Sequence, residues 1–158
     1  MCSSDLFPSH DTIGNSIEMG NTTKTLLGEI VRDYDCNRAF IIEFHNGDSF
    51  SSVMPNWKLS ITYEIVDSKT KRISEKFQNI RASLMIDIIS GCSTKDYPEG
   101  VTCYENNEYC CDDSLIAFNV DEMENTYAKG ILQYYGSKYL FGKPLKRDGK
   151  IIGILFID

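Results

Sequence analysis

The sequence predicts an α+β domain in which helices pack on an antiparallel sheet, and three patterns indicate this fold class. Apolar and polar residues alternate with a period of two over residues 57–66, as in a half-buried strand. Apolar residues over 12–33 and 73–90 recur at steps of three and four, as on one face of a helix. Near the end of the chain, Asp148 and Gly149 separate two apolar segments, a strong signal for a hairpin.

Length and composition narrow the class of protein. The 158 residues have the length of one domain, and 42% of them are apolar. We divide them into a lead-in with the helix start at 1–19 and a domain at 20–158. The net charge of −7 argues against nucleic acid as a partner. No apolar run reaches the ~20 residues of a membrane span and no signal-peptide core is present, so we expect a cytoplasmic protein with no membrane partner.

The first half of the chain predicts one helix and two strands. The helix runs over 12–33, and its firm part starts near Asn21, because two glycines weaken the beginning. β-branched and aromatic residues predict a strand over 38–45. In the next strand, over 57–66, alternation puts one set of side chains on each face. The apolar set is Trp57, Leu59, Ile61, Tyr63 and Ile65, and the polar set is Lys58, Ser60, Thr62 and Glu64.

The middle of the chain predicts two further helices around an irregular stretch. Residues 73–90 form an amphipathic helix that ends at Gly91. The irregular interval 91–116 includes short strands near 101–105 and 114–118. Residues 119–122 resemble a capping box, so the next helix is expected over 120–135.

The last 22 residues predict two paired strands, over 137–145 and 151–158. Gly153 lies inside the second strand, which indicates that a neighbouring backbone approaches closely there. The predicted order is therefore helix, strand, strand, helix, irregular segment, helix, strand, strand.

The chemical state of the six cysteines has three alternatives. Without a secretory signal, free thiols are expected, because the cytosol keeps thiols reduced. A disulfide and a zinc site are the alternatives, although the adjacent pair Cys110-Cys111 does not have the usual spacing of zinc ligands. The cysteines are Cys2, Cys36, Cys92, Cys103, Cys110 and Cys111.

The closing hairpin resembles that of a GAF domain. Lys143-Pro144-Leu145, the turn Asp148-Gly149-Lys150 and the segment Ile151-Ile152-Gly153-Ile154-Leu155 match the closing pattern of that family. The opening helix that leads through Asn37-Arg38-Ala39 into an apolar strand is also similar, and the element order agrees over about residues 20–158. Phe44-His45-Asn46-Gly47 and Ser60-Ile61-Thr62-Tyr63-Glu64 resemble a smaller GAF-like group of phage and prokaryotic genomes, as do Gln78-Asn79-Ile80 and Ser83.

The resemblance implies a GAF- or PAS-like antiparallel sheet and a sensory domain that holds a small molecule between the sheet and its covering helices. On this chain the polar set at that place would be His45, Asn46, Ser60, Thr62 and Glu64. The alternative is that His45 and Asn46 serve a turn and that the other three face solvent. The sequence names no cofactor, because the motifs of the bilin-binding and cyclic-nucleotide-binding members are missing.

Two other functions remain open. The first is a ligand-free interaction module that uses the same fold for dimerisation, with a pocket filled by side chains such as Trp57 and Phe77. For the sensory domain, the resemblance implies a homodimer that pairs through the N-terminal helix. The second is a thiol redox enzyme similar to the free-methionine sulfoxide reductases, which share the GAF fold. In that case Cys92, Cys103 and Cys110 would carry the chemistry.

Overall fold

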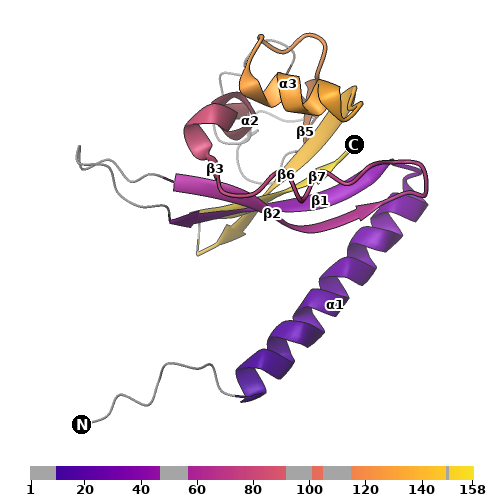
Figure 1. Ribbon diagram of the computed structural model, residues 1–158, viewed down its shortest axis with the longest axis vertical. Helices are drawn as coiled ribbons and strands as arrows, with labels where there is room; N and C mark the ends of the chain where they lie inside the picture. Colours follow the sequence, from indigo (N-terminus) through magenta and orange to yellow (C-terminus); the bar gives the residue numbers. More distant parts are fainter. Residues whose placement is uncertain (1–9, 47–56, 92–100, 105–114, 149) are drawn as a thin grey trace.

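The fold is α+β, with one antiparallel sheet and helices on both of its faces (Figure 1). The structure is a computed structural model that describes residues 10–46, 57–91, 101–104, 115–148 and 150–158. The elements are α1 (His10–Asp33), β1 (Arg38–Asn46), β2 (Trp57–Val66), β3 (Ile80–Arg81), the 3-10 helix η1 (Ala82–Met85), α2 (Ile86–Gly91), β4 (Val101–Tyr104), β5 (Leu115–Asn119), α3 (Tyr127–Tyr134), β6 (Tyr139–Arg147) and β7 (Lys150–Ile157). The strand order is β3-β2-β1-β7-β6-β5-β4.

The helices lie on opposite sides of the sheet. α2 and α3 cover one face, whereas α1 contacts β1 and β2 from the other face and then runs away from the sheet (Figure 1). The hydrophobic core fills the layer between the sheet and α2 and α3. Three phenylalanines from three strands meet in it: the rings of Phe40 and Phe156 stack at 5.3 Å, and Phe118 meets Phe156 edge-on at 6.2 Å. The predicted α+β fold class is confirmed.

The strand predictions are confirmed. β1, β2, β4, β5, β6 and β7 lie where they were expected, within about two residues at each end. Arg147 pairs with Lys150, so a two-residue connection closes the predicted hairpin. A Cβ atom added to Gly153 would collide with the backbone carbonyl oxygen of Ile42 in β1. This contact confirms the close approach of a neighbouring backbone and explains why β7 has a glycine there.

A β-bulge in β2 makes the predicted alternation of that strand wrong. Ile42 pairs with Ile61 and Ile41 with Tyr63, so Thr62 is an extra residue with no partner in β1. An inserted residue moves all later side chains to the opposite face. Glu64 therefore lies on the core face, opposite Phe40, and both residues are buried.

The prediction of one helix over 73–90 is wrong. Ile73, Phe77 and Ile88 are buried as their spacing requires, but the backbone follows the edge of β2 before it becomes helical. Ile61 donates its backbone N–H to the carbonyl of Phe77 at 3.0 Å, and Asn79 has a positive φ of 55°. Hydrogen bonding to the free edge of β2 thus replaces the first turns of the expected helix.

The prediction of a helix over 120–135 is wrong in its first half. The carbonyl of Asn119 accepts hydrogen bonds from Glu122 and Met123, which form a single turn. The helix starts at Tyr127, after Thr126, whose side-chain oxygen accepts from the backbone N–H of Lys129 at 3.4 Å. Thr126 is therefore the N-cap of α3, seven residues after the start of the pattern that resembles a capping box.

Candidate functional site

The structure divides the five predicted site residues between two faces of the sheet. His45 and Ser60 lie together, with 2.9 Å between His45 Nε2 and Ser60 Oγ. Thr62 is exposed at the bulge, and Glu64 is buried on the opposite face. Asn46 ends β1, and its side chain lies outside the described residues. The five residues therefore do not form one polar cluster.

The pair of His45 and Ser60 links three segments. Ser60 Oγ also accepts the backbone N–H of Asn79 at 2.9 Å, which ties β1 and β2 to the segment before β3. A hydroxyl beside an imidazole has the geometry of a nucleophile and its base. However, Ser60 is only 7% exposed. Its described contacts therefore support a role in joining the strands.

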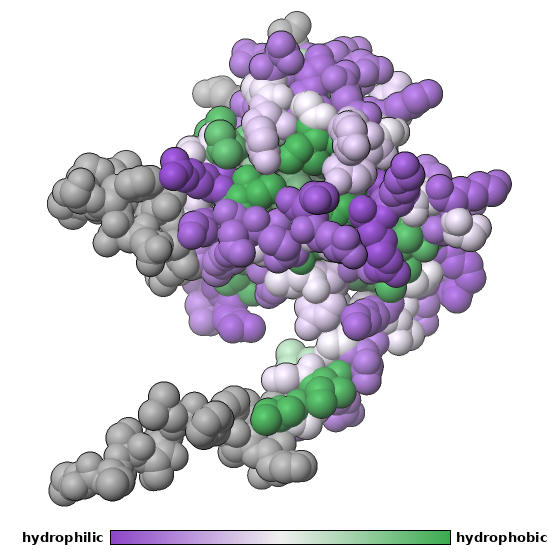
Figure 2. All heavy atoms as spheres, viewed as in Figure 1, coloured by the Kyte–Doolittle hydropathy of each residue, from purple (hydrophilic) through white to green (hydrophobic). Residues whose placement is uncertain are grey.

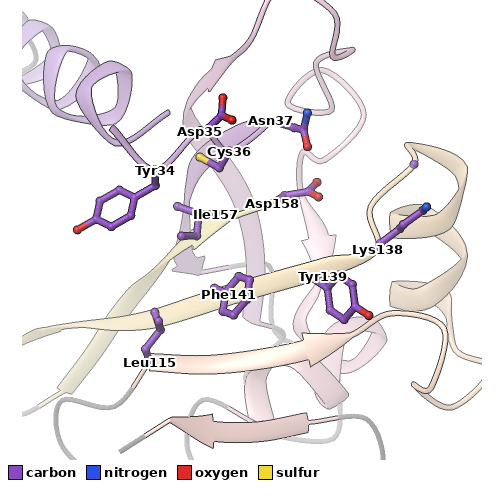
Figure 3. Close-up of a pocket in the computed structure, with 11 residues that line it drawn as sticks. Tyr34, Asp35, Cys36, Asn37, Leu115, Lys138, Tyr139, Phe141, Ile157 and Asp158 are labelled. Atoms are coloured by element: carbon purple, nitrogen blue, oxygen red, sulfur yellow. The ribbon is translucent and has the colours of Figure 1, made fainter. Parts of the chain in front are cut away.

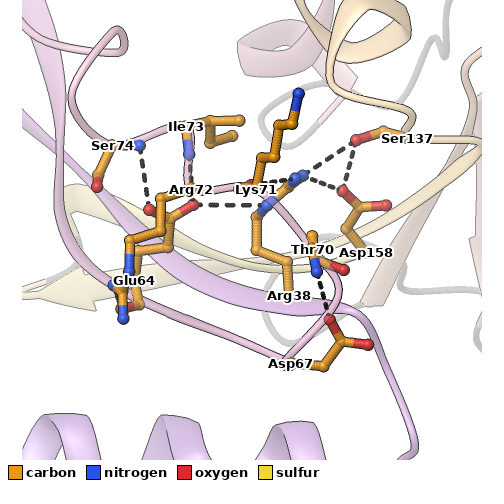
Figure 4. Close-up of polar contacts among 10 residues, drawn as sticks. All are labelled: Arg38, Glu64, Asp67, Thr70, Lys71, Arg72, Ile73, Ser74, Ser137 and Asp158. Atoms are coloured by element: carbon orange, nitrogen blue, oxygen red, sulfur yellow. Dashed lines mark hydrogen bonds and ion pairs between the residues drawn. The ribbon is translucent and has the colours of Figure 1, made fainter.

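A buried arginine at the start of β1 connects two carboxylates (Figure 4). The side chain of Arg38 has no exposed surface, and its Nε lies 3.5 Å from Oε1 of Glu64. Nη1 forms an ion pair with Oδ2 of Asp158 and donates to Ser137 Oγ at 3.3 Å. Nη2 donates to the carbonyl of Lys71 at 2.9 Å. A buried charge is tolerated only when it is paired, so these contacts are required for Arg38 to be buried.

Glu64 also holds the segment that follows β2 (Figure 4). Its Oε1 accepts the backbone N–H of Ile73 at 2.9 Å, and its Oε2 accepts that of Ser74 at 3.1 Å. Both carboxylate oxygens thus have partners inside the protein. Strict alternation predicts that Glu64 faces a ligand, but in the structure its carboxylate binds these backbone N–H groups instead.

Arg38, Glu64, Ser137 and Asp158 together form what we call the arginine cluster. Asp158 is its second carboxylate, and the side chain of Asp158 is 9% exposed. Burial raises the pKa of the Asp158 carboxyl above its usual value, whereas the hydrogen bond from Ser137 and the positive charge of Arg38 act in the opposite direction. A single buried cation therefore lies between two acids, one of which binds its proton more tightly than a free aspartate does.

Sequence reasoning missed the arginine cluster. Arg38 was interpreted only as the first residue of a strand, and the bulge that turns Glu64 inward has no signal in the composition of β2. Arg38 begins β1, Glu64 lies near the end of β2, and Asp158 directly follows β7. Opposite charges at the ends of strands that pair in the sheet are the signal that could have found the cluster.

A groove of about 670 Å³ lies beside the arginine cluster, where α1 ends (Figure 3). Tyr34 and Cys36 form one wall, and Leu115, Phe141 and Ile157 line it from neighbouring strands. Cys36 is a free thiol, and burial raises its pKa, so it is less often a thiolate than an exposed cysteine. No residue of the predicted ligand set lines this groove.

Between the sheet and its covering helices, the described apolar side chains pack closely together. Phe77, Met85 and Met123 are all at most 3% exposed and belong to the same core cluster. Trp57, which was expected to help fill a pocket there, is 47% exposed. Cys92 and Cys110 lie outside the described residues, and only the backbone of Cys103 is described.

No protein-family model matches the chain, and no curated protein is significantly similar to it. Over the described part of the chain, no helix is long and apolar enough to cross a membrane. Among the same residues, no group of three histidine, cysteine or acidic side chains is placed to hold a metal ion.

Proposed function

We propose that this chain is a GAF-like regulatory domain that works as an interaction module and pairs with a second copy through α1. The observation that carries the proposal is an apolar stripe on α1 that continues beyond the sheet. Leu27 is buried against the sheet, whereas Ile13 and Ile17 are 48% and 61% exposed. Figure 2 shows apolar side chains gathered on the projecting N-terminal half of α1.

The spacing of the stripe is that of a helix-pairing seam. Positions 13, 17, 20, 24, 27, 31 and 34 alternate steps of four and three residues, as the a and d positions of a coiled coil do, and all of them except Gly20 and Lys24 have large apolar side chains. The stripe meets the sheet at Gly20, where an added Cβ atom would touch the Tyr63 hydroxyl at 3.5 Å, and at Leu27, which is buried. All residues from 13 to 19 are exposed. The first part of the seam is therefore free for a partner.

The charge of α1 opposes pairing with a second copy only weakly. The described side chains of α1 carry three acids and two bases, Glu18, Glu29 and Asp33 against Lys24 and Arg32. Their sum is −1, although the whole chain carries −7. Two α1 helices would thus repel each other weakly, and burial of the exposed isoleucines would supply the free energy of association.

Light scattering coupled to gel filtration tests the proposal on the full chain. We expect a dimer whose fraction rises with protein concentration, and we expect the double variant Ile13→Asp/Ile17→Asp to be monomeric. The matched control is Thr22→Asp/Thr25→Asp, which adds the same charges on another face of α1 and should leave the dimer intact. A monomeric parent protein, or a control that dissociates as readily, would contradict the proposal.

A small-molecule sensor is the second candidate, and the groove at the end of α1 is the observation that favours it. Among the described residues, the layer between the sheet and the helices is closely packed, so we place the ligand in this groove. Native mass spectrometry of protein purified without refolding would show a bound metabolite as a mass that disappears on denaturation. The thiol redox enzyme and the cytoplasmic location stay predictions.

A further inference from the structure

The groove at the end of α1 has an apolar floor and aromatic walls (Figure 3). Phe141 pairs with both Ala117 and Ile157, so Phe141, Ile157 and Leu115 share one face of three neighbouring strands. The rings of Tyr34 and Tyr139 stand at the sides and are 74% and 57% exposed. This half of the groove offers contact to an apolar or aromatic body, and its volume lies in the range of small-molecule sites.

A second hollow of about 400 Å³ continues from the first, and the two share Asn37, Gly136 and Asp158 in their linings. Lys69 and Lys71 line the second hollow, and Lys138 lines the first. Each of the two hollows therefore has at least one lysine in its lining.

The linings of the two hollows hold more basic than acidic side chains. Within the described part of the chain, no ion pair involves Lys69, Lys71 or Lys138. Asp158 is engaged with Arg38 and Ser137. Asp67, which accepts the backbone N–H groups of Lys69 and Thr70 at 2.9 Å and 2.7 Å, lines neither hollow. Asp35 is the one remaining acid in the linings, against three lysines.

We propose that the joined hollows bind an amphipathic organic anion, a molecule with an apolar or aromatic body and a carboxylate, phosphate or sulfonate end. The body would lie on Leu115, Phe141 and Ile157 between the two tyrosines. The anionic end would face the lysines, which form no ion pair with a described acid. This inference does not depend on self-association through α1, although both involve that helix.

The probe for the test is 8-anilinonaphthalene-1-sulfonate, an aromatic sulfonate whose fluorescence rises in apolar sites, and Nile red is its uncharged counterpart. We expect saturable binding of both dyes to the full chain. Lys69→Glu/Lys71→Glu should weaken the sulfonate about tenfold and leave Nile red unchanged, because an exposed charge pair contributes about a factor of five and reversal adds repulsion. Tyr139→Ser should weaken both dyes.

Lys143→Glu is the matched control, because Lys143 is exposed on β6 but lines neither hollow. It should leave both dissociation constants unchanged. The proposal would be overturned if the sulfonate responded equally to Lys69→Glu/Lys71→Glu and to the control, or if Tyr139→Ser affected neither dye. Light scattering on the same samples separates the two proposals. Lysine-dependent binding of the sulfonate to a monomeric protein would support the anion site and contradict the proposed dimer.

Discussion

Removal of the buried Arg38 tests whether the arginine cluster stabilises the fold. Arg38→Met replaces the cation with an apolar side chain of similar length and leaves the carboxylates of Glu64 and Asp158 without a positive partner. Removal of one member of a buried ion pair costs about 3–5 kcal/mol. With a urea dependence of about 2 kcal/mol per M for a domain of this size, the unfolding midpoint should fall by about 1.5–2.5 M.

The matched control is Arg32→Met, which breaks an ion pair with Asp33 whose side chains are 70% and 59% exposed. Exposed pairs contribute about 0–1 kcal/mol, so its midpoint should barely move. If Arg38→Met does not fold, Arg38→Lys keeps the charge, loses part of the hydrogen bonding and should cost about 1–3 kcal/mol. A midpoint for Arg38→Met close to that of Arg32→Met would refute the assignment of the cluster as a structural anchor.

Three further predictions concern single positions. Gly153→Ala should destabilise the protein by about 1–3 kcal/mol because the new Cβ meets a backbone oxygen of β1. Gly130→Ala, in α3 with open space around it, should stabilise the protein by about 0.5–1 kcal/mol, and thermal denaturation compares the two. Thr126→Ala should cost about 1 kcal/mol through loss of the cap of α3, and Thr25→Ala is its control. The pKa of Asp158 is higher in the folded protein than its ordinary value of 3.8, so protonation of Asp158 stabilises the fold at low pH. This stabilisation is lost as the pH rises from about 3.8 through the pKa of the folded state. The difference in unfolding free energy between parent and Asp158→Asn should therefore shift against the parent from pH 4 to pH 7, and a constant difference would contradict this.

The sheet could be predicted from the sequence because its signals are local. The turn at Asp148-Gly149 sets the register of the last hairpin, and the strand over 38–45 is rich in side chains that favour a pleated, buried surface. Gly153 marks a backbone contact between β1 and β7, which are distant in sequence. In that case a single residue type carried information about tertiary structure, since any side chain would collide there.

The errors arose where tertiary contacts override local patterns. Residues 73–81 have helical spacing, but the free edge of β2 and the carboxylate of Glu64 bind their backbone groups instead. The position of Glu64 in turn follows from the bulge at Thr62, which no propensity marks. One inserted residue thus moved a candidate ligand contact into the arginine cluster and separated Glu64 from Ser60.

The junction between α1 and β1 explains how the two proposals relate to each other. Asn37 and Arg38 donate their backbone N–H groups to the carbonyl of Asp158, and Asp67 donates its own to the carbonyl of Asn37. These bonds and the side chain of Arg38 hold the segment that follows α1, and α1 itself contacts β1 and β2, whereas residues 13–19 at its other end are exposed. The position of the exposed end of α1 therefore depends on the packed end. A ligand in the groove that touches Tyr34 and Asn37 would therefore act on the position of Ile13 and Ile17, and dimerisation measured with and without the sulfonate probe would show the coupling.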